Sequence, residues 1–425
     1  MIRSTRAGSG MEVKFLRGAT VTFSDGNRKL ICDPWLVDGI YYGSWAHYPA
    51  YTEEDWKEDR PDDVDYIYVS HIHPDHFDPN TLKRLNPEAK ILIHSYAQKF
   101  LKAKIDALGF ETIELENGDE FDMGSGFKIR VFAADDCDPT KCGVFFGCAG
   151  KSTQIDSLAV ISTPTTNIVN ANDAPWGLSY KLARALGDDY RVDLACLAHG
   201  LAGAFPQCFV GTNEWRAHCA NLRAAETLRL MLKWMTALRT RTVLPFAAGY
   251  VLAGPLAYLN NVRGIPSVAN AAQLLREVGA TPVGNTLDYG GMDEYVSNVL
   301  RTRKLDYEDD PFPAQQELAD LVPAAFARFD KHRQEMDFKG KNTVNIKIGE
   351  EWFVIPPEGE GALSCSPHTQ EPYMSIVADP RLLKWLLSGP KRAHWNNAEI
   401  GSHLTFDLKG PRELALSLLM SYFHA

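Results

Sequence analysis

Three histidines and one aspartate lie within six residues in the stretch His71-Ile72-His73-Pro74-Asp75-His76. The stretch follows Val64–Val69, an apolar-rich run that predicts a buried strand. Asp78 then offers an N-cap and Pro79 a first-turn proline, so we expect a helix to begin there. So many imidazole and carboxylate groups between a strand and a helix predict a metal site rather than a solvated polar loop.

The spacing of these residues fits two metal ions. His71 and His73 can meet one ion from a tight loop, while Asp75 and His76 can turn to a second ion close by. Two cations held ~3.5–4 Å apart need an anionic bridge to offset their repulsion, and the carboxylate of Asp173 suits that role. Imidazole and carboxylate ligands suit zinc, iron or manganese.

Four predicted strands end in residue types that bind metals. They end at His71, at Asp135-Asp136, at Asp173 and at His199. In layered α/β folds, sites form where strand ends and their loops converge, so we expect these residues to share one site. An Asx turn at Asp173 and an ordinary loop histidine at His199 are the alternative interpretations.

Composition narrows the class of protein. The chain has 425 residues, a net charge of −10 and 23% charged residues, which argues against nucleic acid or an anionic membrane surface as partner. No apolar run approaches the length needed to span a bilayer. Eight cysteines in a chain this long do not indicate a disulfide scaffold. We expect a reduced, cytoplasmic protein that acts on a small molecule.

The order of predicted elements indicates an α/β fold with a small appended region. We expect residues 1–10 to be a disordered leader, residues 11–305 to form the main domain, and residues 306–425 to form a C-terminal α+β extension packed on it. The acidic, proline-rich stretch Tyr307–Pro313 predicts the crossing loop between them. Tyr41–Asp63, rich in aromatic residues, proline and acids, predicts an irregular loop.

The His71–His76 stretch resembles the H-x-H-x-D-H signature of the metallo-β-lactamase superfamily, which implies an αββα sandwich and a metal site. The surrounding residues are similar to the metallo-β-lactamase portion of CMP-N-acetylneuraminate hydroxylase. This likeness runs in order along most of the chain, at Asp33–Leu36, Asp65–Ser70, Thr81–Leu85, Leu201–Pro206, Pro245–Tyr250, Gly284–Asp288 and Trp395–Gly401.

The resemblance implies an oxygen-dependent hydroxylase. That family uses iron, and a Rieske domain ahead of the fold delivers electrons. We expect no Rieske domain in this chain, which implies a separate electron-donating reductase. The chain also resembles the stand-alone non-heme diiron monooxygenases of platensimycin and platencin biosynthesis, which hydroxylate a diterpenoid acyl-CoA scaffold. The resemblance therefore implies two iron ions, O2 as co-substrate and a polycyclic natural-product substrate.

Two departures from the hydrolases of the superfamily favour iron over zinc. Those hydrolases usually have a histidine just before a strand near Ser157, where this chain has none, so Asp136, Asp138 or Asp156 would have to replace it. Their Pro-x-His motif reads Pro245-Phe246-Ala247 here, and His199 could fill the vacancy. Both changes shift the ligands toward oxygen, which stabilises the higher oxidation states of iron.

Two alternatives stay open. The first is a dinuclear zinc hydrolase of an ester, lactone or phosphodiester, and the second is a binding module without metal. Aromatic residues flank the predicted site and would suit an apolar polycyclic substrate, although an ordinary core explains each of them equally well. They are Tyr41, Tyr42, Trp45, Trp176, Phe205 and Tyr250.

Overall fold

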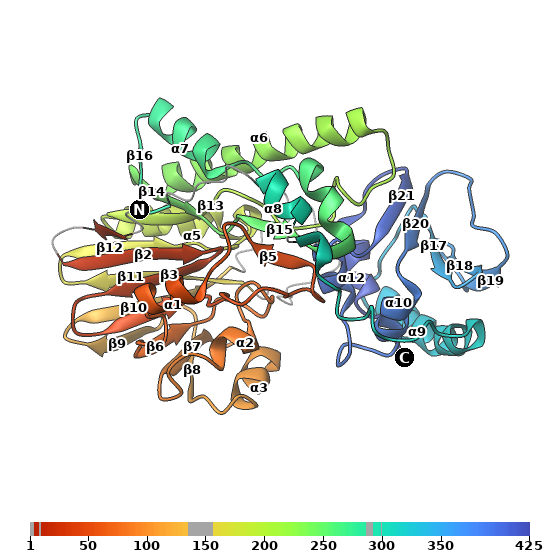
Figure 1. The fold of residues 1–425 in the computed structure, drawn as a ribbon, viewed down its shortest axis with the longest axis horizontal. Coiled ribbons are helices and arrows are strands. Elements are labelled where there is room, and N and C mark those ends of the chain that lie inside the picture. The colour runs from red at the N-terminus through yellow and green to blue at the C-terminus, as the bar shows by residue number, and fades with distance from the viewer. Residues whose placement is uncertain (1–3, 8–9, 135–155, 286–291, 299) are drawn as a thin grey trace.

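The computed structural model describes residues 4–7, 10–134, 156–285, 292–298 and 300–425. In this part of the chain two sheets of seven strands lie face to face, and helices cover both outer faces (Figure 1). A smaller region with its own sheet follows at the C-terminal end. The predicted αββα sandwich with an appended C-terminal region is confirmed.

The first sheet contains the strand that leads into the His71–His76 stretch. Its order is β1-β2-β3-β4-β6-β7-β8, antiparallel as far as β4 and parallel from β4 onward. The bounds are β1 Ser4–Ala7, β2 Met11–Arg17, β3 Thr20–Ser24, β4 Lys29–Cys32, β6 Tyr66–Tyr68, β7 Lys90–His94 and β8 Thr112–Leu115. Ser4–Ala7 pair with Met11–Lys14, which corrects the expectation of a disordered leader for these residues.

The second sheet brings the other predicted strand ends to the same region. Its order is β16-β14-β13-β12-β11-β10-β9. The bounds are β9 Glu120–Gly124, β10 Phe127–Ala133, β11 Ser157–Thr163, β12 Thr166–Asn170, β13 Leu194–Ala198, β14 Thr242–Phe246 and β16 Thr281–Pro282. The predicted hairpin around Pro164 is formed by β11 and β12. Parallel pairing of β12, β13 and β14 places their carboxyl ends at one edge.

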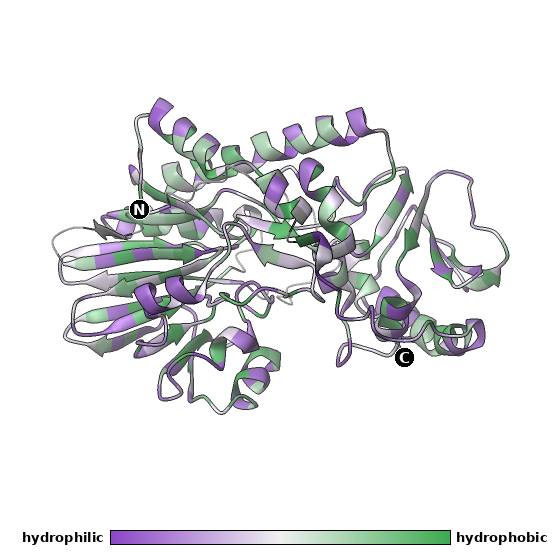
Figure 2. Ribbon diagram, viewed as in Figure 1, coloured by the Kyte–Doolittle hydropathy of each residue, from purple (hydrophilic) through white to green (hydrophobic). Residues whose placement is uncertain are grey.

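An apolar core fills the space between the sheets. Along β10, buried and half-buried residues alternate, as they should in a strand with one face in a core. Phe15, Phe23 and Phe127 are fully buried in this core, and each such ring contributes ~1.5–3 kcal/mol. In Figure 2 hydrophobic and hydrophilic residues alternate along the strands.

Helices with amphipathic sequences cover the outer faces of the sandwich. Their apolar sides pack on the first sheet in one cluster of buried side chains and on the second sheet in another. The first sheet carries α1 Glu53–Asp59, α2 Pro79–Leu82 and α3 Phe100–Asp106; the second carries α5 Trp176–Asp189, α6 Asn213–Ala237 and α7 Val268–Glu277.

The stretch Tyr41–Asp63 has more structure than the sequence predicted. β5 Trp45–His47 pairs with β15 Tyr250–Leu252, and α1 begins at a capping box formed by Thr52 and Asp55. The aromatic and proline content obscured both elements, because β5 is only three residues long and its partner lies about two hundred residues away in the chain.

The C-terminal extension has its own sheet, in the order β19-β18-β17-β20-β21. Its elements are α9 Gln315–Glu335, β17 Thr343–Ile348, β18 Glu351–Ile355, β19 Ala362–Ser364, β20 Tyr373–Val377, α10 Pro380–Leu387, α11 Trp395–Ile400, β21 Thr405–Lys409 and α12 Leu414–Met420. The connecting segment carries η1 Gly254–Val262, α8 Met292–Asn298 and η2 Leu300–Thr302.

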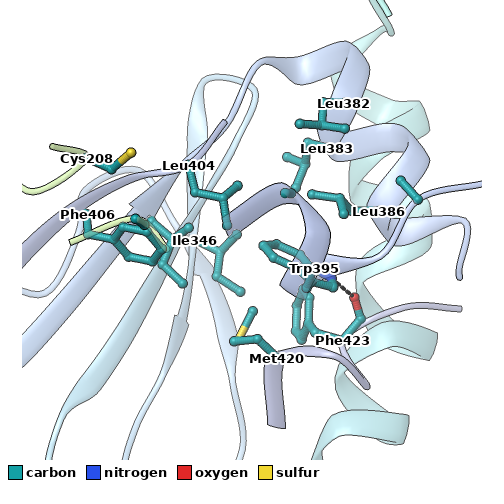
Figure 3. Packing of buried hydrophobic residues seen from close by; sticks show 14 of the residues in the cluster. Cys208, Ile346, Leu382, Leu383, Leu386, Trp395, Leu404, Phe406, Met420 and Phe423 are labelled. Carbon is teal, nitrogen blue, oxygen red and sulfur yellow. Dashed lines mark hydrogen bonds between the residues drawn. The ribbon is translucent and has the colours of Figure 1, made fainter. Parts of the chain in front are cut away.

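One hydrophobic cluster joins the extension to the sandwich. It includes Trp35, Trp45 and Phe209 from the sandwich together with Phe329 and Trp395 from the extension. Figure 3 shows its C-terminal part, where leucines of α10 and Phe423 surround Trp395. We propose residues 306–425 as a distinct extension that has its own sheet but shares a core with the main domain. Among the described residues, no helix combines the length and apolar character needed to cross a membrane.

Candidate metal centre

The His71–His76 stretch leaves the first sheet at the carboxyl edge of its parallel strands. Two backbone hydrogen bonds extend the ladder past β6, from Asp33 N–H to the Tyr68 carbonyl (2.8 Å) and from Val69 N–H to the Leu92 carbonyl (3.1 Å). The chain then turns tightly, because the amides of His76 and Phe77 both donate to the His73 carbonyl. Asp78 caps α2 as predicted, through the amides of Asn80 and Thr81.

One set of ligand atoms converges around His71. Its Nε2 lies 2.9 Å from Nδ1 of His73 and 3.6 Å from an Oδ1 of Asp156. Two imidazole nitrogens and one carboxylate oxygen this close together could all coordinate a single cation. Asp156, directly before β11, therefore lies beside His71. Of the three acids that we predicted as the replacement ligand, it is the one within the described residues.

A second set of atoms converges around His76. Its Nε2 lies 3.5 Å from Oδ2 of Asp75 and 3.4 Å from Oδ2 of Asp173. One ligand atom from each of His71, His76 and Asp173 lies within 4.8 Å of the other two. Asp173 thus lies between the two sets, in a position suited to a bridging carboxylate.

Asp33, which sequence reasoning did not name as a site residue, orients two of the histidines. His76 donates from Nδ1 to Oδ2 of this buried carboxylate at 2.9 Å. The Ser70 hydroxyl also donates to Oδ2 (2.9 Å) and lies 3.0 Å from Nδ1 of His71, from which it can accept. Both histidines then present the lone pair of Nε2 to the site, as ligating histidines do when the second nitrogen is held by an acceptor.

The buried nitrogen of His76 and the carboxylates around it are suited to bind a cation. Nε2 of His76 is buried and has no hydrogen-bond partner among them, although carboxylates face it. An unsatisfied buried polar atom costs ~1–3 kcal/mol, so this nitrogen needs a proton shared with the carboxylates or a metal ion. Burial lowers the pKa of His76, but the charges of Asp33, Asp75 and Asp173 together raise it well above its ordinary value. The same carboxylates would stabilise a bound cation.

The pKa values of the other titratable groups reflect how close together the carboxylates of the centre lie. Burial raises the pKa of Asp156 to about 7, and the charge of Asp173 acts in the same direction. Burial also raises the pKa of Asp75, with Asp173 adding to the effect. Burial lowers the pKa of both His71 and His73, which favours the neutral form that binds metal.

The remaining predicted ligands are less closely joined to the centre. His199 follows β13, and its Nδ1 lies 3.0 Å from the Phe246 carbonyl, to which it can donate. Nε2 is then the nitrogen that could coordinate a metal. Burial lowers its pKa to about 4. Within the described residues, no contact joins His199 to the other histidines. Asp136 and the alternative Asp138 lie outside the described residues.

A pocket opens beside the two carboxylates Asp75 and Asp173. It encloses about 10 Å³, and it measures about 350 Å³ when the open solvent at its mouth is included. Aromatic and small residues form the rest of its lining: Gly18, Ala19, Trp35, Trp45, Gly200, Leu201, Ala202, Ala247, Ala248 and Tyr250. Of the aromatic residues that we predicted near the site, Trp45 and Tyr250 line the pocket and stack with ring centroids 3.3 Å apart. Trp176 lies elsewhere, against Trp234 on the outer face.

Tyr41 contacts the centre directly, through a bond that the sequence did not reveal. Its hydroxyl donates to Oδ1 of Asp75 at 2.6 Å. The residue is buried and has a left-handed backbone with φ of 51°, and Tyr42 beside it has φ of 57°. Such a conformation in bulky residues costs on the order of 1–3 kcal/mol and persists where the surroundings enforce it.

Comparisons with known proteins agree with this architecture. Residues 12–141 match the family model described as the beta-lactamase superfamily domain. Over 147 residues, 34% of this chain, the sequence is 44% identical to a Mycolicibacterium smegmatis protein whose name places it among Rieske 2Fe-2S iron-sulfur proteins. Over 261 residues, 58% of this chain, it is 24% identical to the cytidine monophosphate-N-acetylneuraminic acid hydroxylase of Pan troglodytes. The matches span 26% and 39% of these relatives.

Among solved structures, CmlA, a diiron beta-hydroxylase from Streptomyces venezuelae, aligns with a TM-score of 0.40 and 17% identity, over 64% of this chain and 52% of that one. The facing sheets, the outer helices and the family match over residues 12–141 together identify the chain as a protein with the metallo-β-lactamase fold.

Proposed function

We propose that this chain is a non-heme diiron monooxygenase that hydroxylates an unactivated C–H bond. The observation that carries the proposal is the carboxylate-rich ligand set, in which Asp156 lies beside His71 where hydrolases of the resembling superfamily have a histidine. Oxygen ligands favour the higher oxidation states that iron needs for O2 chemistry. The hydroxylase and Rieske names of the relatives support iron-dependent oxidation.

The residues of this chain divide into two ligand sets with one bridge. His71 through Nε2, His73 through Nδ1 and Asp156 would hold one ion. Asp75 and His76 would hold the other, with His199 as a further ligand. Asp173 would bridge them. Two iron ions bound there would supply the activation of O2.

The protein's own contribution is to orient these groups and to bind an apolar substrate. Ser70 holds the proton of His71 on Nδ1, and Asp33 does the same for His76. Trp35, Trp45 and Tyr250 form an apolar wall that binds hydrocarbon surface and excludes water from the reacting carbon.

The substrate that we propose is a polycyclic natural product of the diterpenoid acyl-CoA class, which the sequence resemblance implies and whose apolar surface the aromatic residues of the pocket would suit. In the described part of the chain two carboxylates and no basic side chain line the pocket, which would favour a substrate without negative charge near the metals. Electrons would come from a separate reductase. An iron–sulfur protein is the class of donor that the Rieske-named relatives favour.

Metal analysis and oxygen uptake test the proposal. Protein purified without added metal should contain about two iron ions per chain and should consume O2 when a chemical reductant is added. Zinc in that stoichiometry, with ester hydrolysis at a rate independent of O2, would refute the proposal and establish the dinuclear zinc hydrolase.

A further inference from the structure

The stretch Trp395–Gly401 contributes no ligand to the centre, although it is one of the segments that carry the sequence resemblance. It forms α11 in the C-terminal extension. Asn396, in this helix, lies 323 residues after His73 in the sequence. The structure nevertheless brings this helix against the metal-binding loop. Oδ1 of Asn396 lies 2.9 Å from Nε2 of His73.

The position of Asn396 is set by packing on both sides of it. Trp395 is buried in the core of the extension and donates from Nε1 to the Phe423 carbonyl at 2.8 Å (Figure 3). The backbone amide of His394 donates to the hydroxyl of Tyr42 at 2.7 Å. The buried Ala398 accepts a backbone bond from His403 at 2.9 Å. These contacts fix the position of α11 and therefore the position of the half-buried Asn396 side chain.

His73 differs from the other two histidines in the nitrogen that it offers. His71 and His76 keep the proton on Nδ1, where Ser70 and Asp33 accept it, and offer Nε2. In His73 it is Nδ1 that faces Nε2 of His71, at 2.9 Å. For Nδ1 to carry a lone pair, the proton must be on Nε2, and that proton needs an acceptor. The carbonyl oxygen of Asn396 is the acceptor at hydrogen-bond distance.

We propose that Asn396 is a positioning residue for the metal centre, which accepts the Nε2 proton of His73 and so makes Nδ1 the ligating nitrogen. The inference rests on the proposed metal centre but requires neither iron nor O2 chemistry. It makes the C-terminal extension a structural part of the centre, because one of the two ligand sets depends on an amide that the sandwich does not supply. Loss of such an outer partner typically weakens metal binding ~10–100-fold.

Cobalt(II) binding to the full chain tests this inference with three variants. Asn396→Leu keeps the size of the side chain but removes the acceptor. Asn396→Asp keeps an acceptor oxygen. Lys391→Ala is the control, because this exposed residue lies in the turn just before the same helix. Affinity is measured by competition with a chelator, and proton NMR of the cobalt protein detects the exchangeable N–H protons of ligating histidines.

We expect Asn396→Leu to bind cobalt ~10–100-fold more weakly and to lose one exchangeable imidazole signal. Asn396→Asp and Lys391→Ala should keep the affinity and all of the signals. An Asn396→Leu protein with unchanged affinity and signals would overturn the inference while leaving the metal centre intact. A wild-type chain that binds neither cobalt nor iron would overturn the proposed function itself, and this inference with it.

Discussion

At the scale of single residues, the buried carboxylate of Asp33 accepts three hydrogen bonds from residues of the metal-binding loop. It accepts from the Ser70 amide (2.7 Å), from the Ser70 hydroxyl (2.9 Å) and from Nδ1 of His76 (2.9 Å). Asp33→Asn preserves the shape but replaces one acceptor oxygen with a donor. We expect metal binding to weaken ~10–100-fold and the free energy of unfolding of the metal-free protein to fall by about 1–3 kcal/mol.

Chelator competition and urea unfolding measure the two effects of Asp33→Asn. The control is Asp106→Asn, on the exposed side of α3, which should change stability by less than about 0.5 kcal/mol. A variant that binds metal as tightly as the wild type would show that Asp33 does not orient His76.

Tyr41 holds Oδ1 of Asp75, which keeps Oδ2 turned toward His76 and the proposed ion. Tyr41→Phe removes the hydroxyl of the 2.6 Å bond and leaves the ring and its contact with Trp45. Hydrogen bonds to charged groups contribute ~1.5–3 kcal/mol, so we expect a loss of that order in the free energy of unfolding. Occupancy of the ion bound by Asp75 and His76 should fall as well. Tyr258→Phe, at a tyrosine that is 65% exposed, is the control. Unchanged stability and metal content in Tyr41→Phe would exclude a role for the hydroxyl.

At the scale of elements, the loop after α11 is hydrogen-bonded to the turn that carries Tyr41. His403 lies at hydrogen-bond distance from the Tyr41 carbonyl through Nε2 (2.7 Å) and from the Tyr307 hydroxyl through Nδ1 (3.0 Å). Burial lowers the pKa of His403 to about 4, from an ordinary value near 6.5. The folded protein thus keeps His403 neutral, and the unfolded chain takes up the proton first as the pH falls.

His403 therefore makes stability depend on pH. Its contribution is fully present above pH ~6.5 and is lost as the pH falls toward ~4, with a total on the order of 3 kcal/mol. His403→Gln keeps a side-chain donor but cannot titrate. The stability difference between wild type and His403→Gln, followed by urea unfolding from pH 7.5 to 4.5, should shift by that amount in favour of the variant. A difference that stays constant with pH would contradict a buried neutral histidine.

At the scale of the whole molecule, the shared core makes the extension and the metal centre interdependent. Trp395→Ala empties the space beside Phe423 and should lower the free energy of unfolding by ~3–5 kcal/mol. Because Asn396 follows directly, metal affinity should fall in the same variant. Leu363→Ala, at a residue 42% exposed in β19, is the control and should change neither quantity. Loss of stability without loss of metal affinity would show that the two parts are independent.

The local pattern of the sequence was enough to predict individual strands, the capped helix and a group of candidate ligands, while the αββα sandwich followed from the resemblance of the His71–His76 stretch to a known signature. His71, His73, Asp75 and His76 lie within one turn between a strand and a capped helix, so their spacing alone brings them together. The hairpin of β11 and β12 followed from apolar runs around Pro164 for the same reason. Neighbouring residues are near one another in any fold, and a short-range pattern therefore survives folding.

Only the tertiary structure revealed what orients those ligands. The bonds from Asp33 to His76, from Tyr41 to Asp75 and from His73 to Asn396 join residues 43, 34 and 323 positions apart. Which distant side chain meets a given nitrogen depends on how sheets and helices cross, and no local spacing encodes that crossing. The His71–His76 stretch therefore predicts which residues can bind metal, while the packing of the C-terminal extension on the sandwich decides which nitrogen of His73 is free to do so.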